Sequence, residues 1–362
     1  MLSAPDVSVV ICTYNRGPLL RSALQHVAAQ ELGDLRFEVW IINNNSSDDT
    51  QQVIDEFING RANWHTFFEA RQGLSYARNS GIERARAPIV AFTDDDIAVR
   101  PDWIAQIVRT MREHPEVDYI GGKVLPRWHA PPPKWLSRLN WTPLAMTDHG
   151  EEPFYVSITR PWCLVGANLA IRTSALLWAG GFNPDFQRVK DGIGSTEDHE
   201  FQFRLWRDGR LGMYVPNVVV EAEVQEDRHQ KRYHRKWHEG HARYCARMGT
   251  ETISEDMPEL FGMPACYIRL MAMHGAGWIT SMVHGRPDRA FVHENKIRFL
   301  VNYVRQYHVD RQTNGMRHTL TRTARGVREL ARRKLSPAAG LAELRGEHLR
   351  AHGQAKRMRA SR

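Results

Sequence analysis

Short apolar runs alternate with amphipathic stretches over the first 125 residues. Runs with the length of buried strands lie at residues 7–12, 37–42, 88–92 and 117–121. Apolar residues at helical spacing between them predict helices over 18–30, 49–58, 73–85 and 103–113. Strands that alternate with helices are typical of βαβ units, so we expect a doubly wound, mostly parallel α/β sheet flanked by helices.

The pattern weakens between residues 126 and 161. Three consecutive prolines begin at Pro131, and Trp128, Trp135 and Trp141 lie in the same stretch. This composition predicts a long loop of the kind that often forms a lid or a binding surface. Further strands are predicted over 162–172 and 214–220, and further helices over 174–179 and 197–208. Beyond Arg228 the chain is predicted to be helical, without strands.

Charge divides the chain unevenly. Residues 317–362 hold 13 Lys and Arg residues against three Asp and Glu residues, a net charge of +10, whereas the whole chain has a net charge of +8 and the remaining residues therefore sum to −2. We expect an α/β domain over 1–250, a helical appendage over 251–316, and a basic tail over 317–362 that is helical or partly disordered. Such a tail can bind an anionic membrane surface or remain a solvated helix. It lacks interleaved aromatic residues, so no nucleic acid is expected.

The composition is ordinary for a soluble globular protein, with 42% hydrophobic and 25% charged residues. The four cysteines are far apart and form no CxxC pair. We therefore expect reduced thiols and a cytoplasmic location, with peripheral attachment to the inner face of the membrane as a further expectation. No uncharged apolar run reaches the length of about 18 residues that indicates a membrane span.

Three aspartates, Asp94-Asp95-Asp96, follow one apolar run almost directly. In open α/β sheets, ligands bind beyond the carboxyl ends of the strands. Carboxylates at such a strand end can hold a hard divalent cation, which in turn can hold a diphosphate. An acidic turn without a ligand is the alternative that these residues alone leave open.

Seven segments match one family in order and spacing. They are Thr13-Tyr14-Asn15-Arg16, Asn43-Asn44-Asn45-Ser46-Ser47-Asp48-Asp49-Thr50, Ala77-Arg78-Asn79-Ser80-Gly81, Asp94-Asp95-Asp96, Gly166-Ala167-Asn168, Gly180-Gly181-Phe182 and Glu197-Asp198. Over residues 7–245 the chain resembles the inverting family 2 glycosyltransferases of the GT-A fold. The resemblance implies that residues 1–250 form a nucleotide-sugar-binding and catalytic domain.

The resemblance also implies a donor site. It places the following residues against the nucleotide or the donor sugar: Thr13, Tyr14, Asn15, Arg16, Asn43, Asn45, Arg71, Arg78, Asp94, Asp95, Gly166, Ala167 and Asn168. Asn43 stands where the family usually has an aspartate that binds the base, so uridine, guanosine and thymidine all remain open. Asp48 and Asp49 are expected to cap the next helix instead.

Metal and catalytic roles follow from the same resemblance. Asp96 is the expected ligand of Mn²⁺ or Mg²⁺, and Glu223 stands where the family often has a metal-binding histidine. Asp198 is the expected base that takes the proton of the acceptor hydroxyl, and Glu197 positions acceptor or sugar. The segment from Gln225 to His229 is also similar to the QxxRW signature of processive synthases, with His in place of Trp.

We therefore expect a metal-dependent, inverting glycosyltransferase. It would move a sugar from a nucleotide diphosphate donor to a hydroxyl of a glycan or lipid-linked saccharide, in surface polysaccharide biosynthesis. A non-catalytic glycan-binding or scaffolding relative and a sugar nucleotidyltransferase remain as alternatives. The latter class generally has a glycine-rich loop after the first strand, which the segment Thr13 to Arg16 does not match.

Overall fold

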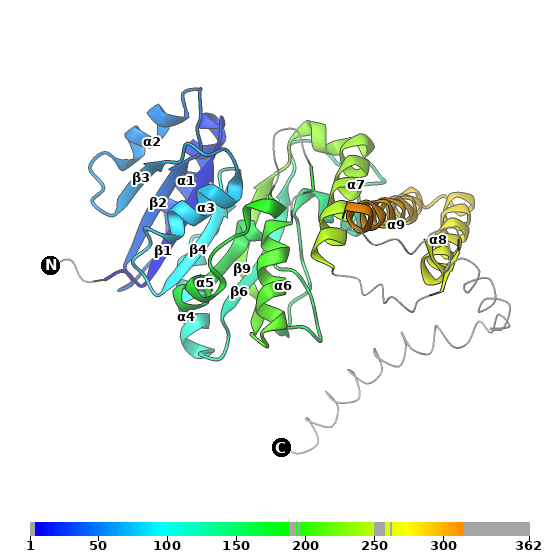
Figure 1. Ribbon diagram of the computed structural model, residues 1–362. Coiled ribbons are helices and arrows are strands. Elements are labelled where there is room, and N and C mark those ends of the chain that lie inside the picture. The colour runs from blue at the N-terminus through cyan, green and yellow to red at the C-terminus, as the bar shows by residue number, and fades with distance from the viewer. Residues whose placement is uncertain (1–3, 188–192, 195, 250–257, 261–262, 314–362) are drawn as a thin grey trace, which may run out of the picture. The chain divides into compact units, whose positions relative to one another are not determined.

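A computed structural model describes residues 4–187, 193–194, 196–249, 258–260 and 263–313 (Figure 1). The chain separates into two compact units. The first consists of residues 1–250 and 274–307, and the second of residues 251–273 and 308–362. Residues 274–307, which the sequence assigned to an appendage, thus belong to the same unit as the sheet.

A nine-stranded mixed sheet forms the centre of the first unit. Its strands are β1 (Val7–Thr13), β2 (Phe37–Asn43), β3 (Trp64–Phe68), β4 (Ile89–Asp94), β5 (Ile97–Val99), β6 (Tyr119–Arg127), β7 (Phe154–Val156), β8 (Leu169–Arg172) and β9 (Gly212–Glu223). The order is β3-β2-β1-β4-β8-β6-β9-β5, with β7 paired to β9. The first four strands in this order are mutually parallel, whereas β8 is antiparallel to both of its neighbours. The predicted fold class is confirmed.

Helices cover both faces of the sheet (Figure 1). They are α1 (Gly17–Ala28), α2 (Thr50–Ile58), α3 (Leu74–Ile82), α4 (Trp103–Glu113), α5 (Thr173–Ala179) and α6 (Glu197–Arg207). Alternate residues of β1 point to opposite faces, so Val9 packs with α1, α2 and α4, and Val10 packs with α3, α5 and α6. This burial on both faces explains why the strands are continuous apolar runs.

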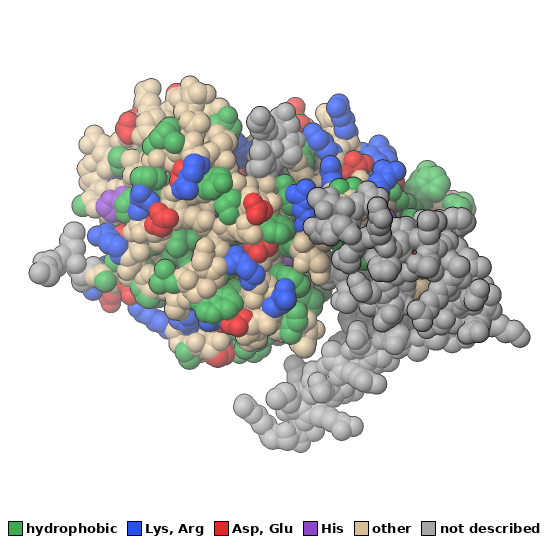
Figure 2. Space-filling model, in the orientation of Figure 1, with side chains coloured by type: hydrophobic (Ala, Val, Ile, Leu, Met, Phe, Trp, Pro, Cys, Tyr) green, Lys and Arg blue, Asp and Glu red, His purple; other side chains and the backbone are tan. Residues whose placement is uncertain are grey.

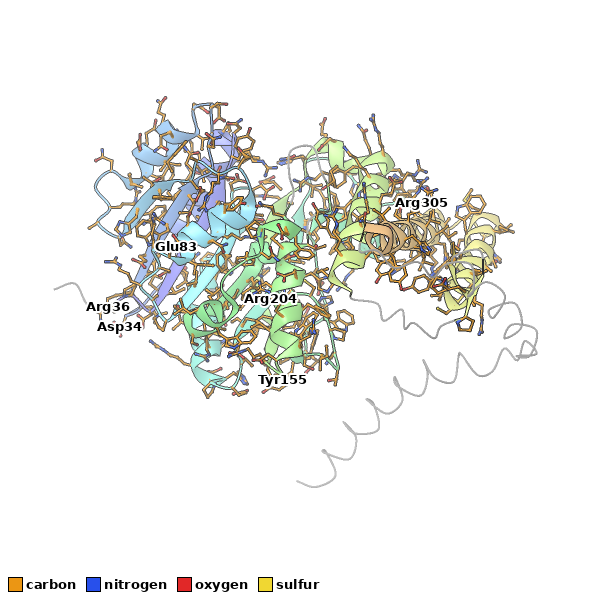
Figure 3. All side chains as sticks on the ribbon, in the orientation of Figure 1. Asp34, Arg36, Glu83, Tyr155, Arg204 and Arg305 are labelled. Carbon is orange, nitrogen blue, oxygen red and sulfur yellow. The ribbon has the colours of Figure 1, made fainter. Side chains whose placement is uncertain are left out.

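Polar contacts fasten α6 to the turn that follows α5. Arg204 of α6, labelled in Figure 3, donates to Glu200 Oε1 at 2.8 Å and to the Gly181 carbonyl at 2.7 Å. Glu197, Asp198 and Glu200 lie in the first turn of α6, where carboxylates are stabilised by the helix dipole. Lys and Arg side chains are interspersed with Asp and Glu on the face shown in Figure 2.

The predicted strand over 162–172 is shorter in the structure. Only Leu169–Arg172 pairs with strands, and Gly166–Asn168 forms a 3₁₀ turn. The reason is that α6 side chains bind the preceding backbone: Gln202 bonds both the N–H and the C=O of Leu164. Strands β3, β5 and β7 were not predicted at all.

The tryptophan-containing segment is largely packed against the protein. It holds β7 and two 3₁₀ turns, Arg138–Asn140 and Thr142–Leu144. Trp128, Trp135 and Trp141 are partly buried against the core. Trp135 lies edge-on to Phe291 with ring centroids 4.8 Å apart. All three rings therefore contribute to packing against the core.

The remaining helices are α7 (Lys231–Met248), α8 (Ala265–Val283) and α9 (Pro287–Thr313), preceded by a 3₁₀ turn at Glu226–His229. Two-residue strands, β10 (Glu259–Leu260) and β11 (Met263–Pro264), form a hairpin that is too short to leave a periodic signal. Among the described residues, no helix combines the length and apolar character that a bilayer crossing requires. The basic tail lies outside the described residues.

Candidate active site

The three polar turns that the sequence singled out lie at one edge of the sheet. Strand β1 pairs in parallel with both β2 and β4. The register places Thr13 opposite Asn43 and Cys12 opposite Asp94. The carboxyl ends of these strands therefore bring together the turns that follow them, as expected for a ligand site in a doubly wound sheet.

Arg16 lies between the last two aspartates of the triplet. Its Nη1 atom is 3.0 Å from Asp95 Oδ1 and 3.0 Å from Asp96 Oδ2. Thr13 Oγ1 donates to Asp95 Oδ2 at 2.8 Å. Arg228 supplies a second guanidinium, 3.8 Å from Asp96 Oδ2. Two buried carboxylates, Asp95 and Asp96, thus lie at the end of β4. The guanidinium groups of Arg16 and Arg228 lie within 4 Å of them.

The triplet has a high local density of negative charge. Burial raises the pKa of Asp95 above its ordinary value, although the Arg16 guanidinium acts in the opposite direction. Burial also raises the pKa of Asp94, against the lowering effect of Arg78. Carboxylates in this environment gain from any further cation that enters the site.

Arg78 of α3 links the triplet to α6. Its buried side chain donates to Glu197 Oε1 at 3.0 Å and lies 3.5 Å from Asp94 Oδ1. The Phe182 ring lies 5.2 Å from the guanidinium carbon. Gly166 leaves room for the guanidinium, because a Cβ atom there would lie 2.8 Å from Arg78 Nη2. Arg78 therefore joins an acid of the triplet and an acid of α6 in one ion network.

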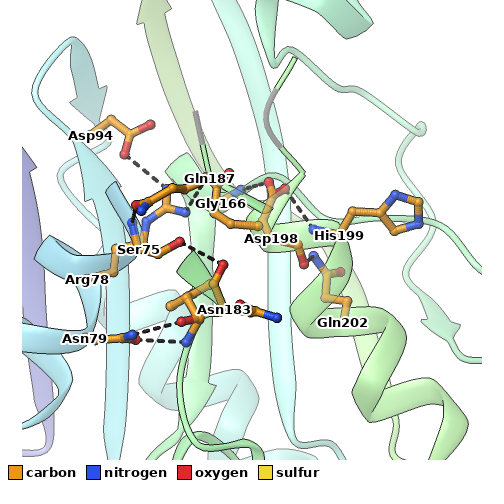
Figure 4. A network of polar contacts seen from close by, with 12 residues as sticks. Ser75, Arg78, Asn79, Asp94, Gly166, Asn183, Gln187, Asp198, His199 and Gln202 are labelled. Atoms are coloured by element: carbon orange, nitrogen blue, oxygen red, sulfur yellow. Dashed lines mark hydrogen bonds and ion pairs between the residues drawn. The ribbon is translucent and has the colours of Figure 1, made fainter. Parts of the chain in front are cut away.

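Asp198 is held by backbone donors at the start of α6 (Figure 4). Its Oδ2 atom accepts from the Gly166 N–H at 3.0 Å, and its Oδ1 atom accepts from the His199 N–H at 2.8 Å. Burial raises the pKa of this carboxyl, while Arg78 and the two N–H groups lower it. The carboxylate is thus fixed in direction, half-buried, and more basic than an ordinary aspartate.

The turns after β1 and β2 are fastened to each other. The Asn15 N–H donates to Ser46 Oγ at 3.0 Å, and Asn15 Oδ1 accepts from the Ser47 N–H at 2.7 Å. Asn45 is exposed and has a positive φ of 62°. Tyr14, which lies between Thr13 and Asn15, is 48% exposed, so its ring faces solvent. The two turns therefore form a stiff rim with an accessible aromatic ring.

Asn43 is buried and its amide is used inside the chain. Its Oδ1 atom accepts from the Ser46 N–H at 2.9 Å, and its Nδ2 atom donates to Gln51 at 2.8 Å. Helix α2 is capped by Asp48, whose carboxylate accepts from the Thr50 N–H at 3.1 Å. Asp49, the other expected cap, makes no such bond.

Arg71 lies on the loop between β3 and α3 and is exposed. Both ends of its guanidinium are bound by Glu69, at 2.9 and 2.8 Å. The guanidinium carbon also lies 4.8 Å from the Tyr76 ring centroid. Its direction is therefore fixed even though most of its surface is open to solvent.

The Gly166–Asn168 turn reaches from the site into the core. Ala167 is buried, and Asn168 is 1% exposed. The Asn168 amide donates to the Lys123 and Val218 carbonyls and accepts from the Trp103 indole at 2.8 Å. Asn168 thus ties β6, β9 and α4 together, and Gly166 is the part of the turn that faces Asp198 and Arg78.

Glu223 ends β9 beside the triplet. Its N–H donates to the Asp96 carbonyl at 3.0 Å, and its carboxylate contacts Arg127 at 3.4 Å and also His129. No group of three metal-ligand atoms within 4.8 Å occurs at the triplet in the described part of the chain. The oxygen donors nevertheless fit Mg²⁺ or Mn²⁺, which are usually bound by one or two carboxylates together with substrate phosphates.

Two residues of this array were not among the expected site residues. Arg228 reaches Asp96, and His129 reaches Glu223. The signal for Arg228 was the QxxR pattern from Gln225, which places an arginine in the 3₁₀ turn that follows β9. No sequence pattern pointed to His129, since β6 was expected to end at Gly121 and not at Arg127.

Comparison with known proteins identifies the family of the chain. A model of glycosyl transferase family group 2 matches residues 89–284, which is more than half of the chain, and the glycosyl transferase family 2 model matches residues 8–166. The chain belongs to the family 2 glycosyltransferases. These matches give no support to the alternative of a sugar nucleotidyltransferase.

Two curated relatives illustrate the range of similarity. The glucosyl-dolichyl phosphate glucuronosyltransferase of Haloferax volcanii is 27% identical over 225 residues, covering 61% of this chain and 70% of the relative. The GalNAc(5)-diNAcBac-PP-undecaprenol β-1,3-glucosyltransferase of Campylobacter jejuni is 33% identical over 94 residues, covering 25% of this chain and 30% of the relative. Other curated relatives are matched over 23–40% of their own length.

Among solved structures, the chain is similar to a mannosyltransferase from Pyrobaculum calidifontis in complex with GDP-Man and Mn²⁺. The two share 17% identity, with a TM-score of 0.50 over 98% of this chain and 87% of the other. At this identity the likeness concerns the fold, which is that of a GT-A glycosyltransferase.

Proposed function

We propose that this glycosyltransferase transfers a sugar from a nucleotide diphosphate donor to a hydroxyl of a lipid-linked saccharide, with inversion at the anomeric carbon. One observation carries the proposal. Arg78 joins Asp94 of the triplet to Glu197, the residue before Asp198, so a donor-binding edge and a fixed carboxylate base lie on one ion network. An inverting displacement needs these two elements on the two sides of the reacting carbon.

The diphosphate would bind at the array formed by Arg16, Asp96 and Arg228. Forked guanidinium groups suit phosphate oxygens, and two of them lie within 4 Å of the triplet carboxylates. The exposed Tyr14 ring is placed to pack on the nucleoside. Asn43 and Asn168 would act indirectly, because both amides are engaged in holding the backbone.

A divalent cation would be held by Asp96, with Glu223 as a second oxygen donor. When bound, it would neutralise charge on the diphosphate leaving group. Arg16 contacts Asp95 and Asp96 at 3.0 Å, so it would turn towards the phosphates as the carboxylates bind the ion. A metal ion could thus replace the Arg16 guanidinium beside Asp95 and Asp96, and neither buried carboxylate would be left without a cation.

Asp198 would accept the proton of the attacking hydroxyl. Its two backbone bonds hold the carboxylate in place, and burial raises its pKa, which strengthens it as a base. Glu197 would position the acceptor or sugar through its ion pair with Arg78. Names of two relatives refer to dolichyl phosphate and undecaprenol, which supports a lipid-linked acceptor. Contact of residues 317–362 with an anionic membrane surface stays a prediction.

A transfer assay tests the proposal. We expect the full chain with Mn²⁺ to consume one of a panel of UDP-, GDP- and TDP-sugars when a polyprenyl-linked saccharide is present. The product sugar should have the anomeric configuration opposite to that of the donor, as read by NMR. Chelation by EDTA should lower the rate at least about tenfold, because charge on the leaving group is then less stabilised.

Added Mn²⁺ should restore the rate after EDTA treatment. A product that keeps the donor configuration would contradict direct displacement. An unchanged rate in EDTA would contradict the metal assignment while leaving glycosyl transfer intact.

A further inference from the structure

A cluster of three metal-ligating side chains lies between α6 and α7, outside the donor site. His199 is the third residue of α6, and His241 and Cys245 are four residues apart on α7, hence on one face of that helix. One ligand atom from each of the three lies within 4.8 Å of the other two. No other such group occurs in the part of the chain that the structure describes.

The distances suit a tetrahedral cation. His241 Nε2 lies 3.5 Å from Cys245 Sγ. Two ligands of a tetrahedral zinc, with Zn–N of about 2.0–2.1 Å and Zn–S of about 2.3 Å, are themselves about 3.5 Å apart. The His241 and Cys245 edge therefore has the length that zinc requires. A ring shift of about 1 Å would bring His199 to the same spacing.

Aromatic rings lie against both imidazoles. The Trp206 ring is 5.9 Å from His199, and the Trp237 ring is stacked 4.4 Å from His241. The Nδ1 atom of His241 is buried and has no hydrogen-bond partner among the described residues. A buried polar atom without a partner is uncommon and calls for an explanation.

We propose that His199, His241 and Cys245 bind one Zn²⁺ ion, with water as the fourth ligand. On binding, the Cys245 thiol releases its proton to solvent and the thiolate sulfur bonds to zinc; no oxidation occurs. Imidazole and thiolate together favour zinc over the oxygen-binding Mg²⁺ and Mn²⁺.

Such an ion would fix the start of α6 to α7. The adjoining backbones are already in contact, because a side chain at Gly240 would collide with the Ile193 carbonyl. His199 also donates its N–H to Asp198, so zinc would limit movement of that carboxylate. This last consequence rests on the proposed function, whereas zinc binding itself does not.

Metal content tests the inference without any activity assay. The full chain is purified without chelator or added metal and dialysed, and its zinc is counted by mass spectrometry. We expect about one zinc per chain in the wild type. Competition with a chromophoric chelator should show at least about 100-fold weaker binding in Cys245→Ser, since the thiolate is lost.

Two controls separate this site from others. Cys266→Ser removes an exposed cysteine outside the cluster and should keep wild-type affinity. Asp96→Asn should also keep its zinc, which excludes binding at the triplet. Cobalt(II) loading of the wild type should give a thiolate-to-cobalt charge-transfer band that Cys245→Ser lacks. Wild-type protein without zinc and without this band would overturn the inference, even if Cys245→Ser fails to fold.

Discussion

Replacement of Asp198 by asparagine should lower kcat for glycosyl transfer about 10²- to 10⁴-fold, the range that a positioned general base contributes. Asparagine has nearly the same shape and can still accept from one of the two N–H groups, but it cannot take a proton. Nucleotide binding should change little, because the nucleotide contacts proposed above lie at β1 and β4. Steady-state kinetics and nucleotide titration together measure the two effects.

Asp208→Asn is the matched control. Asp208 directly follows α6 and is exposed, so the same substitution there should leave kcat within about twofold of the wild type. If Asp198→Asn retains near-wild-type kcat with its fold intact, the base is another residue. If it loses nucleotide binding to the same extent as kcat, its role is structural.

Replacement of Arg78 by methionine should lower the free energy of unfolding by about 3–5 kcal/mol, the usual cost of removing one partner from a buried ion pair. The side chain of Arg78 is 3% exposed and that of Glu197 is 5% exposed, so water cannot replace the guanidinium. Methionine keeps the apolar stem, and the loss therefore reports the charge and its hydrogen bonds. Denaturant unfolding of the full chain measures it.

Arg21→Met provides the comparison for an exposed pair. Arg21 binds Glu56 at 2.6 Å with both side chains about half exposed, so its loss should cost no more than about 1 kcal/mol. Adding Glu197→Gln to Arg78→Met should recover part of the stability, because the uncompensated carboxylate is removed. Equal losses for Arg78→Met and Arg21→Met would contradict the buried network.

Long periodic segments made most of the fold predictable. Trp103–Glu113 was predicted to the residue, because its apolar face repeats over three turns. Strands β3, β5 and β7 are three to five residues long and lie where no strong alternation marks them. Their pairing depends on partners far along the chain, since Ile97–Val99 is a strand only because β9 lies beside it. A single sequence does not contain that information in local form.

The site could be predicted in part for a similar reason. The triplet Asp94-Asp95-Asp96 follows a buried strand that the sequence predicts. Its position at the carboxyl end of that strand therefore predicts where it lies on the sheet. The sequence alone does not distinguish an asparagine that contacts a ligand from one that holds the chain together. Asn43 and Asn168 are of the second kind, and their partners are backbone and side-chain groups that only the folded chain brings near. His199 lies 42 residues before His241 in the sequence (241 − 199), so no spacing rule identifies its cluster with His241 and Cys245.

Calorimetric titration of the full chain with UDP, GDP and TDP, each with and without Mn²⁺, tests the donor site most directly. We expect one nucleotide to bind at least about tenfold more tightly with the metal than without it, because both Asp96 and the phosphate oxygens would bind the ion. Asp96→Asn should remove this dependence on Mn²⁺. Failure of all three nucleotides under both conditions, or undiminished metal-dependent binding in Asp96→Asn, would contradict a donor site at the carboxyl ends of β1 and β4.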